Sequence, residues 1–117
     1  MPSRSSSSVR IFYPAISREE LLTLLRQRLP LLQQLLPLQR VVLFGSYATG
    51  RYTVASDIDL LVVYAGAPRE DAYALVKRIL NIRRLEPHVY AEQEYKEVKP
   101  IVERMIRNGI LLPLTED

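Results

Sequence analysis

The sequence of 117 residues has no cysteine and only one histidine, His88. The absence of cysteine excludes disulfides, thiolate metal sites and a cysteine nucleophile, and it fits a reducing compartment such as the cytoplasm. No apolar run approaches the roughly 18 residues that a membrane-spanning helix needs, so we expect no membrane association. The 16 basic and 13 acidic residues nearly balance, and the basic ones form only short groups. This charge pattern allows a nucleotide as partner and argues against nucleic-acid binding.

The length of the chain allows one domain with one hydrophobic core and is too short for two ordinary domains. A composition of 48% hydrophobic and 25% charged residues is typical of a soluble globular protein. Residues 1–16 are predicted to be a flexible tail and lead-in, because Met1–Val9 is rich in serine and lacks the apolar core of a secretory signal. Residues 17–117 are predicted to form the single domain.

Apolar periodicity predicts three main helices. The first begins at Ser17, where a serine and a glutamate have the spacing of a capping box, and Pro30 is expected to end or kink it. The second helix is expected over Arg69–Arg84. The third is expected over Glu92–Asn108, and Pro100 must kink or restart it.

Runs of β-branched and aromatic residues predict the strands of a small sheet. Strands are expected at Val41–Phe44, at Leu60–Val63 and at Leu85–Ala91, where Pro87 favours an edge position or a bulge. Ile110–Leu114 is expected to add a short closing strand. The fold class is therefore predicted as α/β (α+β), with helices packed on a small mixed sheet.

A turn and two acidic residues stand between the first two strands. Gly45 and Ser46 break the first strand, and Gly50 closes the turn. Asp57 and Asp59 open the second strand, and because successive side chains point to opposite faces, these two carboxylates share one face. Two adjacent carboxylates repel each other and lose solvation, so a divalent cation is predicted to lie between them.

Three general motifs do not account for this stretch. The glycine spacing of Gly45–Tyr52 is that of a P-loop, but the phosphate-binding lysine and the Ser/Thr that holds magnesium are missing. An EF-hand is excluded because Leu61 and Val62 stand where an oxygen ligand and the turn glycine belong. A Ser46 nucleophile lacks a hydrolase signature around it. Tyr47 and Tyr52 are expected to fill loop packing rather than to stack on a base.

G-S-x-A-x-G followed by S-D-I-D-L resembles the active-site signature of the DNA polymerase beta-like nucleotidyltransferase superfamily. The short chain points to its minimal nucleotidyltransferases, the MNT family. The resemblance implies that Gly45 and Ser46 hold the triphosphate and that Asp57 and Asp59 bind magnesium. Many relatives carry arginine where Thr49 stands, so Arg51 is the candidate for that charge, and a solvated loop arginine is the alternative.

The resemblance also implies a third carboxylate on a later strand, which would hold a second Mg²⁺. Glu86 is our candidate, because it lies in L-E-P-H-V-Y where the family places an aspartate. His88 shares its face by strand alternation and is a second candidate. The alternatives are a plain surface carboxylate for Glu86 and an ordinary structural histidine for His88.

The function implied by the resemblance is transfer of a nucleoside monophosphate, with ATP as the expected donor, to an acceptor hydroxyl with release of pyrophosphate. Minimal members of the family often work beside a helical HEPN-type protein, and some act as its antitoxin, so a HEPN-type partner is expected. Homo-oligomerisation is left open. The alternative function is a binding module with an idle metal site that acts on such a partner by contact. Nucleic-acid binding rests on net charge alone.

Overall fold

The computed structural model describes residues 16–114. The predicted tail therefore lies outside the described residues except for Ile16, and the division into tail and domain stays a prediction. In chain order the elements are α1 (Arg18–Leu35), β2 (Leu38–Phe44), α2 (Ser46–Thr49), β3 (Ile58–Tyr64), α3 (Ala72–Leu80), β4 (Leu85–Ala91), α4 (Glu92–Met105) and β5 (Ile110–Leu111).

The strands form a four-stranded sheet in the order β4-β3-β2-β5. β2 is antiparallel to β3 and β5, whereas β3 and β4 are parallel, so the predicted mixed sheet is confirmed. Pro87 lies in β4, at the edge of the sheet, as the sequence predicts. The register places Asp59 opposite Phe44 on one side and opposite Glu86 on the other.

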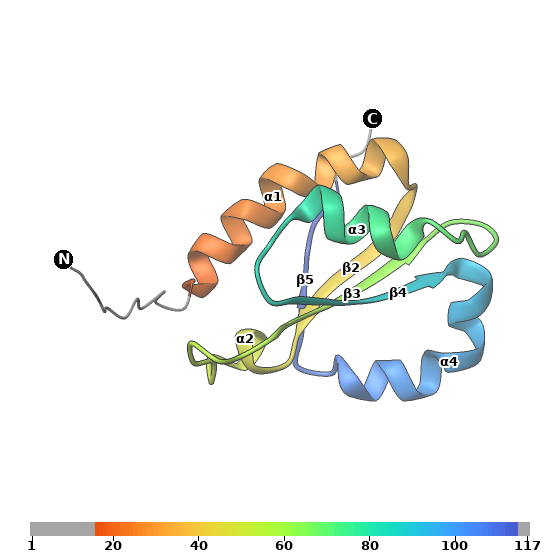
Figure 1. Cartoon of the computed structure of the whole chain (residues 1–117). Coiled ribbons are helices and arrows are strands. Elements are labelled where there is room, and N and C mark those ends of the chain that lie inside the picture. The colour runs from red at the N-terminus through yellow and green to blue at the C-terminus, as the bar shows by residue number, and fades with distance from the viewer. Residues whose placement is uncertain (1–15, 115–117) are drawn as a thin grey trace.

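Helices cover both faces of this sheet (Figure 1). The larger core lies between the sheet and the helices α1 and α3, and it includes residues such as Leu25, Leu60 and Leu80. The smaller core lies on the side of α4 and consists of Val42, Phe44, Leu61, Val63, Tyr95, Val102 and Ile106. Alternation along β3 therefore places Asp59 on the α4 side, at the strand end where the smaller core stops.

The capping box at the start of α1 is present. Ser17 Oγ accepts a hydrogen bond from Glu20 N, and Ser17 N donates to Glu20 Oε1. Of the two alternatives predicted for Pro30, an end of the helix is wrong, because α1 runs through Pro30 to Leu35. Leu29 and Leu32, on either side of the proline, are both buried, and their burial offsets the hydrogen bond that proline cannot donate.

The other two long helices are shorter than the patterns predict. α3 ends at Leu80 because Asn81 adopts a left-handed conformation with φ of 46°, so the expected helix over Arg69–Arg84 is wrong at both ends. α4 runs through Pro100 and ends at Met105, before the predicted end at Asn108. None of the described helices is long and apolar enough to cross a membrane.

A polar network holds α4 to the sheet. Arg40 Nη1, on β2, donates to Glu103 Oε2 at 2.6 Å and to the Tyr95 hydroxyl at 3.1 Å. The Tyr95 hydroxyl in turn donates to the same Glu103 oxygen at 2.7 Å. Burial, reinforced by this bond, raises the pKa of Tyr95 to about 12, and the hydrogen bond from Arg40 lowers the pKa of Glu103.

This network predicts an acid-sensitive contribution to stability. Because the pKa of Glu103 is lower in the folded state, its stabilising effect is complete above its ordinary pKa of 4.5 and is lost as the pH falls through the folded-state value. We expect Glu103→Gln to reduce the free energy of unfolding more at pH 7 than at about pH 3. Urea unfolding at the two pH values measures this difference.

The matched control is Glu97→Gln, which removes an exposed carboxylate from the same helix with no ion pair among the described residues. Its effect on the free energy of unfolding should be small at both pH values. An equal loss for Glu103→Gln at both pH values would contradict the role assigned to the ionised carboxylate.

Candidate active site

The site lies where β2 ends and β3 begins. Gly45 follows β2 with a φ of 76°, a backbone conformation that residues other than glycine rarely adopt. A Cβ atom placed on Gly45 would overlap Asp59 Oδ2, so the backbone of the turn lies directly against the carboxylate on β3. The short helix α2 then begins at Ser46, and Gly50, with a φ of 84°, ends it. The structure thus brings Gly45, Ser46 and Asp59 together.

The two aspartates differ in their surroundings. Asp57 is exposed in the loop before β3, and its Oδ1 lies 3.4 Å from Arg84 Nη2. Asp59 is half-buried within β3, and its Oδ1 lies 3.6 Å from His88 Nε2. Ile58, between them, is buried in the larger core. Neither aspartate forms a buried ion pair, because the side chain of Arg84 is 43% exposed and that of His88 is 35% exposed.

Glu86 lies beside Asp59 on the neighbouring strand. The two residues are partners in the parallel register, so their backbones are about 4.8 Å apart and their side chains leave the same face. Glu86 is exposed. Within residues 16–114, however, no three acidic or histidine side chains are grouped so as to hold a metal ion. Glu86 as a third ligand therefore stays a prediction.

The donor set at this site suits magnesium. Asp57 and Asp59 offer hard oxygen ligands that solvent reaches, and Mg²⁺ is commonly bound by one or two carboxylates while substrate phosphates and water complete its shell. The two aspartates would therefore hold the ion, and nucleotide phosphates would fill positions that the protein leaves open.

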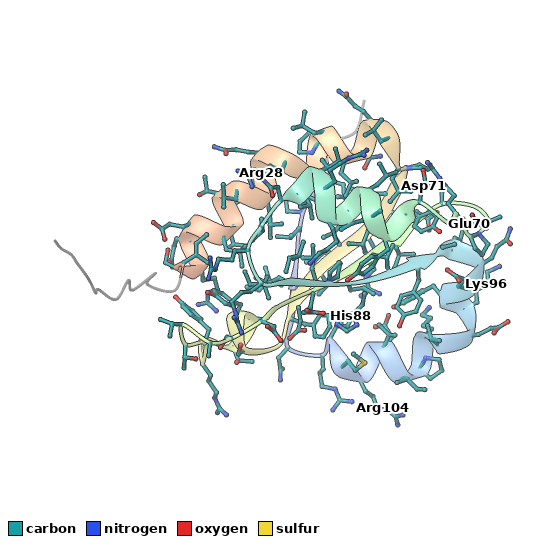
Figure 2. All side chains as sticks on the ribbon, viewed as in Figure 1. Arg28, Glu70, Asp71, His88, Lys96 and Arg104 are labelled. Carbon is teal, nitrogen blue, oxygen red and sulfur yellow. The ribbon has the colours of Figure 1, made fainter. Side chains whose placement is uncertain are left out.

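His88 lies beside Asp59. It lies on the α4 side of the sheet (Figure 2), with its ring 5.1 Å from that of Phe44 and tilted by 54°. Phe44 is itself the register partner of Asp59. The imidazole is therefore packed between an aromatic ring and the carboxylate, which limits the positions that Asp59 can adopt.

The remaining predicted residues lie along the turn. Arg51 is exposed, and its backbone N–H donates to Ser46 O at 3.0 Å and closes α2. The hydroxyl of Thr49 donates back to the carbonyls of Gly45 and Ser46. The structure thus places Arg51 after α2, next to the turn, and leaves its nucleotide-binding role as a prediction.

Arg18 supports the turn and was not predicted from the sequence. Its Nη1 donates to Ala48 O at 2.7 Å and to Tyr47 O at 3.4 Å, so it caps the carboxyl end of α2 from the start of α1. Tyr47 is buried and stacks on Tyr52 with ring centroids 4.1 Å apart. The prediction that both tyrosines fill packing is confirmed. No local pattern could reveal Arg18, because 30 residues separate it from Ala48.

A large hollow of the described structure lies away from these carboxylates. Its volume is about 780 Å³, and it is bordered by the second half of α1, the start of β2 and the segment after β5. Because β2 enters the sheet at this hollow and leaves it at Gly45, the hollow and the aspartates lie at opposite ends of the strand. Size alone would therefore misplace the site.

Comparisons with known proteins agree with this geometry. A family model described as nucleotidyltransferase domain matches residues 25–112. A solved structure of a Sulfolobus solfataricus protein assigned as a nucleotidyltransferase is 28% identical, with a TM-score of 0.55 over 80% of each chain. No curated protein matches the sequence significantly.

Two solved toxin–antitoxin complexes share the fold. One is a variant of the MntA–HpeT complex, 20% identical with a TM-score of 0.52, and the match covers 86% of this chain and 76% of the other. The second contains AMP-PNP and is 22% identical with a TM-score of 0.53 over the same shares. The predicted fold class is confirmed.

The contact between the turn and Asp59 predicts the effect of adding a methyl group. Gly45→Ala should lower the free energy of unfolding by about 2–4 kcal/mol, because it combines positive-φ strain with an overlap. Gly50→Ala is the matched control, since Gly50 also has a positive φ but no atom within 4 Å of an added Cβ. It should cost about 1 kcal/mol. Urea unfolding measures both.

A double-mutant cycle isolates the overlap. In an Asp59→Ala background the carboxylate is gone, so the cost of Gly45→Ala should lose the part that comes from the overlap and keep the backbone strain. That strain is larger at Gly45, with a ψ of -153°, than at Gly50, with a ψ of 9°. An unchanged cost of Gly45→Ala in that background would show that the turn and the carboxylate do not touch.

Proposed function

Since the chain belongs to the nucleotidyltransferase domain family, whose model spans residues 25–112, we propose that it transfers a nucleoside monophosphate from ATP to a hydroxyl group of an acceptor. The expectation of a nucleotidyltransferase enzyme is confirmed by that family. The donor, the metal, the acceptor and the roles of individual residues are the substance of the proposal.

One observation is the main support for this proposal: the backbone of Gly45 lies against the carboxylate of Asp59. A turn without a side chain lets backbone N–H groups approach phosphate oxygens, and Ser46 adds a hydroxyl donor. The same phosphates can then share a cation with Asp57 and Asp59. The contact between Gly45 and Asp59 would therefore place the phosphate site next to the metal site.

The proposed reaction displaces pyrophosphate from the α-phosphorus. The acceptor oxygen bonds to the α-phosphorus, the bond from that phosphorus to the bridging oxygen breaks, and the hydroxyl proton leaves to a carboxylate. Glu86 is the proposed proton acceptor and third carboxylate, because it borders Asp59 in register and solvent reaches it. Magnesium, when bound by Asp57 and Asp59, would neutralise charge on the phosphates.

Two further side chains would hold the aspartates for this reaction. His88 contacts Asp59 Oδ1 and is packed on Phe44, so it fixes the direction of that carboxylate. Arg84 donates to the carbonyls of Ser56 and Ala55 and reaches Asp57 Oδ1. It therefore ties the loop before β3 to the start of β4 and keeps Asp57 close to the strand.

The proposed acceptor is a HEPN-type partner protein, which the chain would modify as an antitoxin. The described part of the chain forms one sheet with its helices and offers no separate acceptor-binding domain. Solved structures with this fold include toxin–antitoxin complexes, one of them with the ATP analogue AMP-PNP. These likenesses support ATP as donor and a protein as acceptor.

A second candidate is a binding module that neutralises its partner by contact. The observation in its favour is that no three metal ligands are grouped within residues 16–114. The intact contact between Gly45 and Asp59 favours the enzyme, because a module that acts by contact has no need of a phosphate turn beside a carboxylate.

Label transfer separates the two candidates. With ATP labelled at the α-phosphate, magnesium and a co-purified partner, the wild-type protein should label the partner, and Asp57→Asn/Asp59→Asn should reduce the rate at least about 100-fold. Asp71→Asn is the matched control: like Asp57, Asp71 is exposed and paired with an arginine, but it precedes α3. Glu86→Gln, read in the same assay, tests the third carboxylate.

The control should label the partner at the wild-type rate. The enzyme is contradicted if the double aspartate variant still neutralises its partner as well as the wild type and neither protein transfers label. That result would establish the binding module.

A further inference from the structure

A second, smaller hollow lies beside the Gly45 turn. Its volume is about 140 Å³, and two parts of the chain line it. The turn contributes Phe44, Gly45 and Thr49, and the end of α4 with the segment after it contributes Arg104, Met105, Arg107, Asn108 and Gly109. The carboxyl end of α4 therefore comes to the same turn that lies against Asp59 (Figure 1).

The two arginines of this hollow are not paired within the described chain. Arg40, Arg69 and Arg84 each form an ion pair with a carboxylate. Arg104 and Arg107 are exposed, and within residues 16–114 neither has a side-chain hydrogen bond or an ion pair. No acidic residue lines the hollow. It therefore presents two positive charges that form no ion pair within residues 16–114.

The position of these arginines is fixed by the packing of the chain that follows them. A Cβ on Gly109 would meet Val42 Cγ1 at 2.6 Å and Leu43 O at 2.8 Å, so this backbone is pressed onto β2. Ile110 then pairs with Leu43, two residues before Gly45. Arg107 is thus held near the turn, because the backbone at Gly109 packs on β2 in a contact that only glycine permits.

The size and chemistry of the hollow indicate which kind of ligand it would bind. At about 140 Å³ it is below the roughly 300 Å³ of pockets that enclose whole small molecules, so a nucleoside would not fit. Two guanidinium groups and a bare glycine backbone suit phosphate oxygens, which arginine binds with paired hydrogen bonds.

We propose that Arg104 and Arg107 bind the β- and γ-phosphates of the nucleotide, which become the pyrophosphate leaving group. The inference rests on the proposed function, which places the α-phosphate at Asp59. Gly45 touches Asp59 and also lines the hollow, so a triphosphate that starts at the carboxylate passes the turn and reaches the arginines. Their charges offset the negative charge that pyrophosphate gains as it leaves.

Affinity for phosphate chains of different length tests this assignment. The variant is Arg104→Gln/Arg107→Gln, and the ligands are inorganic tripolyphosphate and AMP, each measured calorimetrically with magnesium. We expect the variant to bind tripolyphosphate at least about 10-fold more weakly than the wild type and AMP within about 2-fold of it. Both arginines are exposed, so the melting temperature should not change.

The control Arg78→Gln/Lys96→Gln removes two exposed positive charges elsewhere. Lys96 lies at the opposite end of α4 from Arg104 (Figure 2), and Arg78 is on α3. The control should bind tripolyphosphate within about 2-fold of the wild type, because net charge alone is not the cause.

Three results would overturn the assignment: no binding of tripolyphosphate by the wild type, unchanged affinity in the arginine variant, or equal losses for tripolyphosphate and AMP. If the variant keeps its tripolyphosphate affinity but no longer labels the partner, the arginines contact the acceptor instead. Failure of the proposed function is distinguishable, because label transfer by the wild type is measured separately. A wild type that transfers label beside a variant with unchanged affinity refutes only the arginine assignment.

Discussion

The contact between the Gly45 backbone and the Asp59 carboxylate is the constraint from which the site follows. Pairing of β2 with β3 sets Phe44 opposite Asp59, so the turn that leaves β2 must pass over the carboxylate. The turn can do so only with a positive φ and no side chain. A phosphate bound to this turn is therefore within reach of a cation bound to Asp59. The distance between the turn and the Asp59 carboxylate is set by the register of β2 and β3 rather than by loop flexibility.

The rest of the fold supports this contact from both faces of the sheet. On one face, α1 buries its leucines in the larger core and carries Arg18, which caps α2. On the other, the network of Arg40, Tyr95 and Glu103 joins α4 to β2, and Gly109 fits the following chain against the same strand. Helix α4 is thus bonded to β2 through Tyr95 and Glu103, and its carboxyl end borders the turn. The exposed arginines there are positioned by this packing.

Local sequence predicts the features whose cause is local. The alternation of polar and apolar residues sufficed to place Asp59 at the start of β3, and the capping box sufficed to start α1 at Ser17. Features set by distant contacts were beyond such reasoning. α1 continues through Pro30 because buried leucines on both sides hold it, and Arg18 reaches a carbonyl 30 residues away.

The same limit applies to the positions of Glu86, the proposed third carboxylate, and of Arg104 and Arg107 at the end of α4 and after it. That Glu86 borders Asp59 is a matter of strand register, which no single segment encodes. The spacing of Arg104 and Arg107 resembles that of an ordinary solvated helix end, and only the packing of the chain after α4 brings them to Gly45. A pattern over 20 residues can therefore identify the reaction class, while tertiary structure sets the positions of the further residues that we propose for the site.

The central claim is that the turn and Asp59 bind nucleotide and metal as one unit. Calorimetric titration of AMP-PNP into the wild-type protein and into Asp59→Asn, each with magnesium and with EDTA, tests it most directly. The account predicts binding by the wild type with magnesium and at least about 10-fold weaker binding in the other three titrations. Equal affinity with magnesium and with EDTA, or an unchanged affinity in Asp59→Asn, would contradict it.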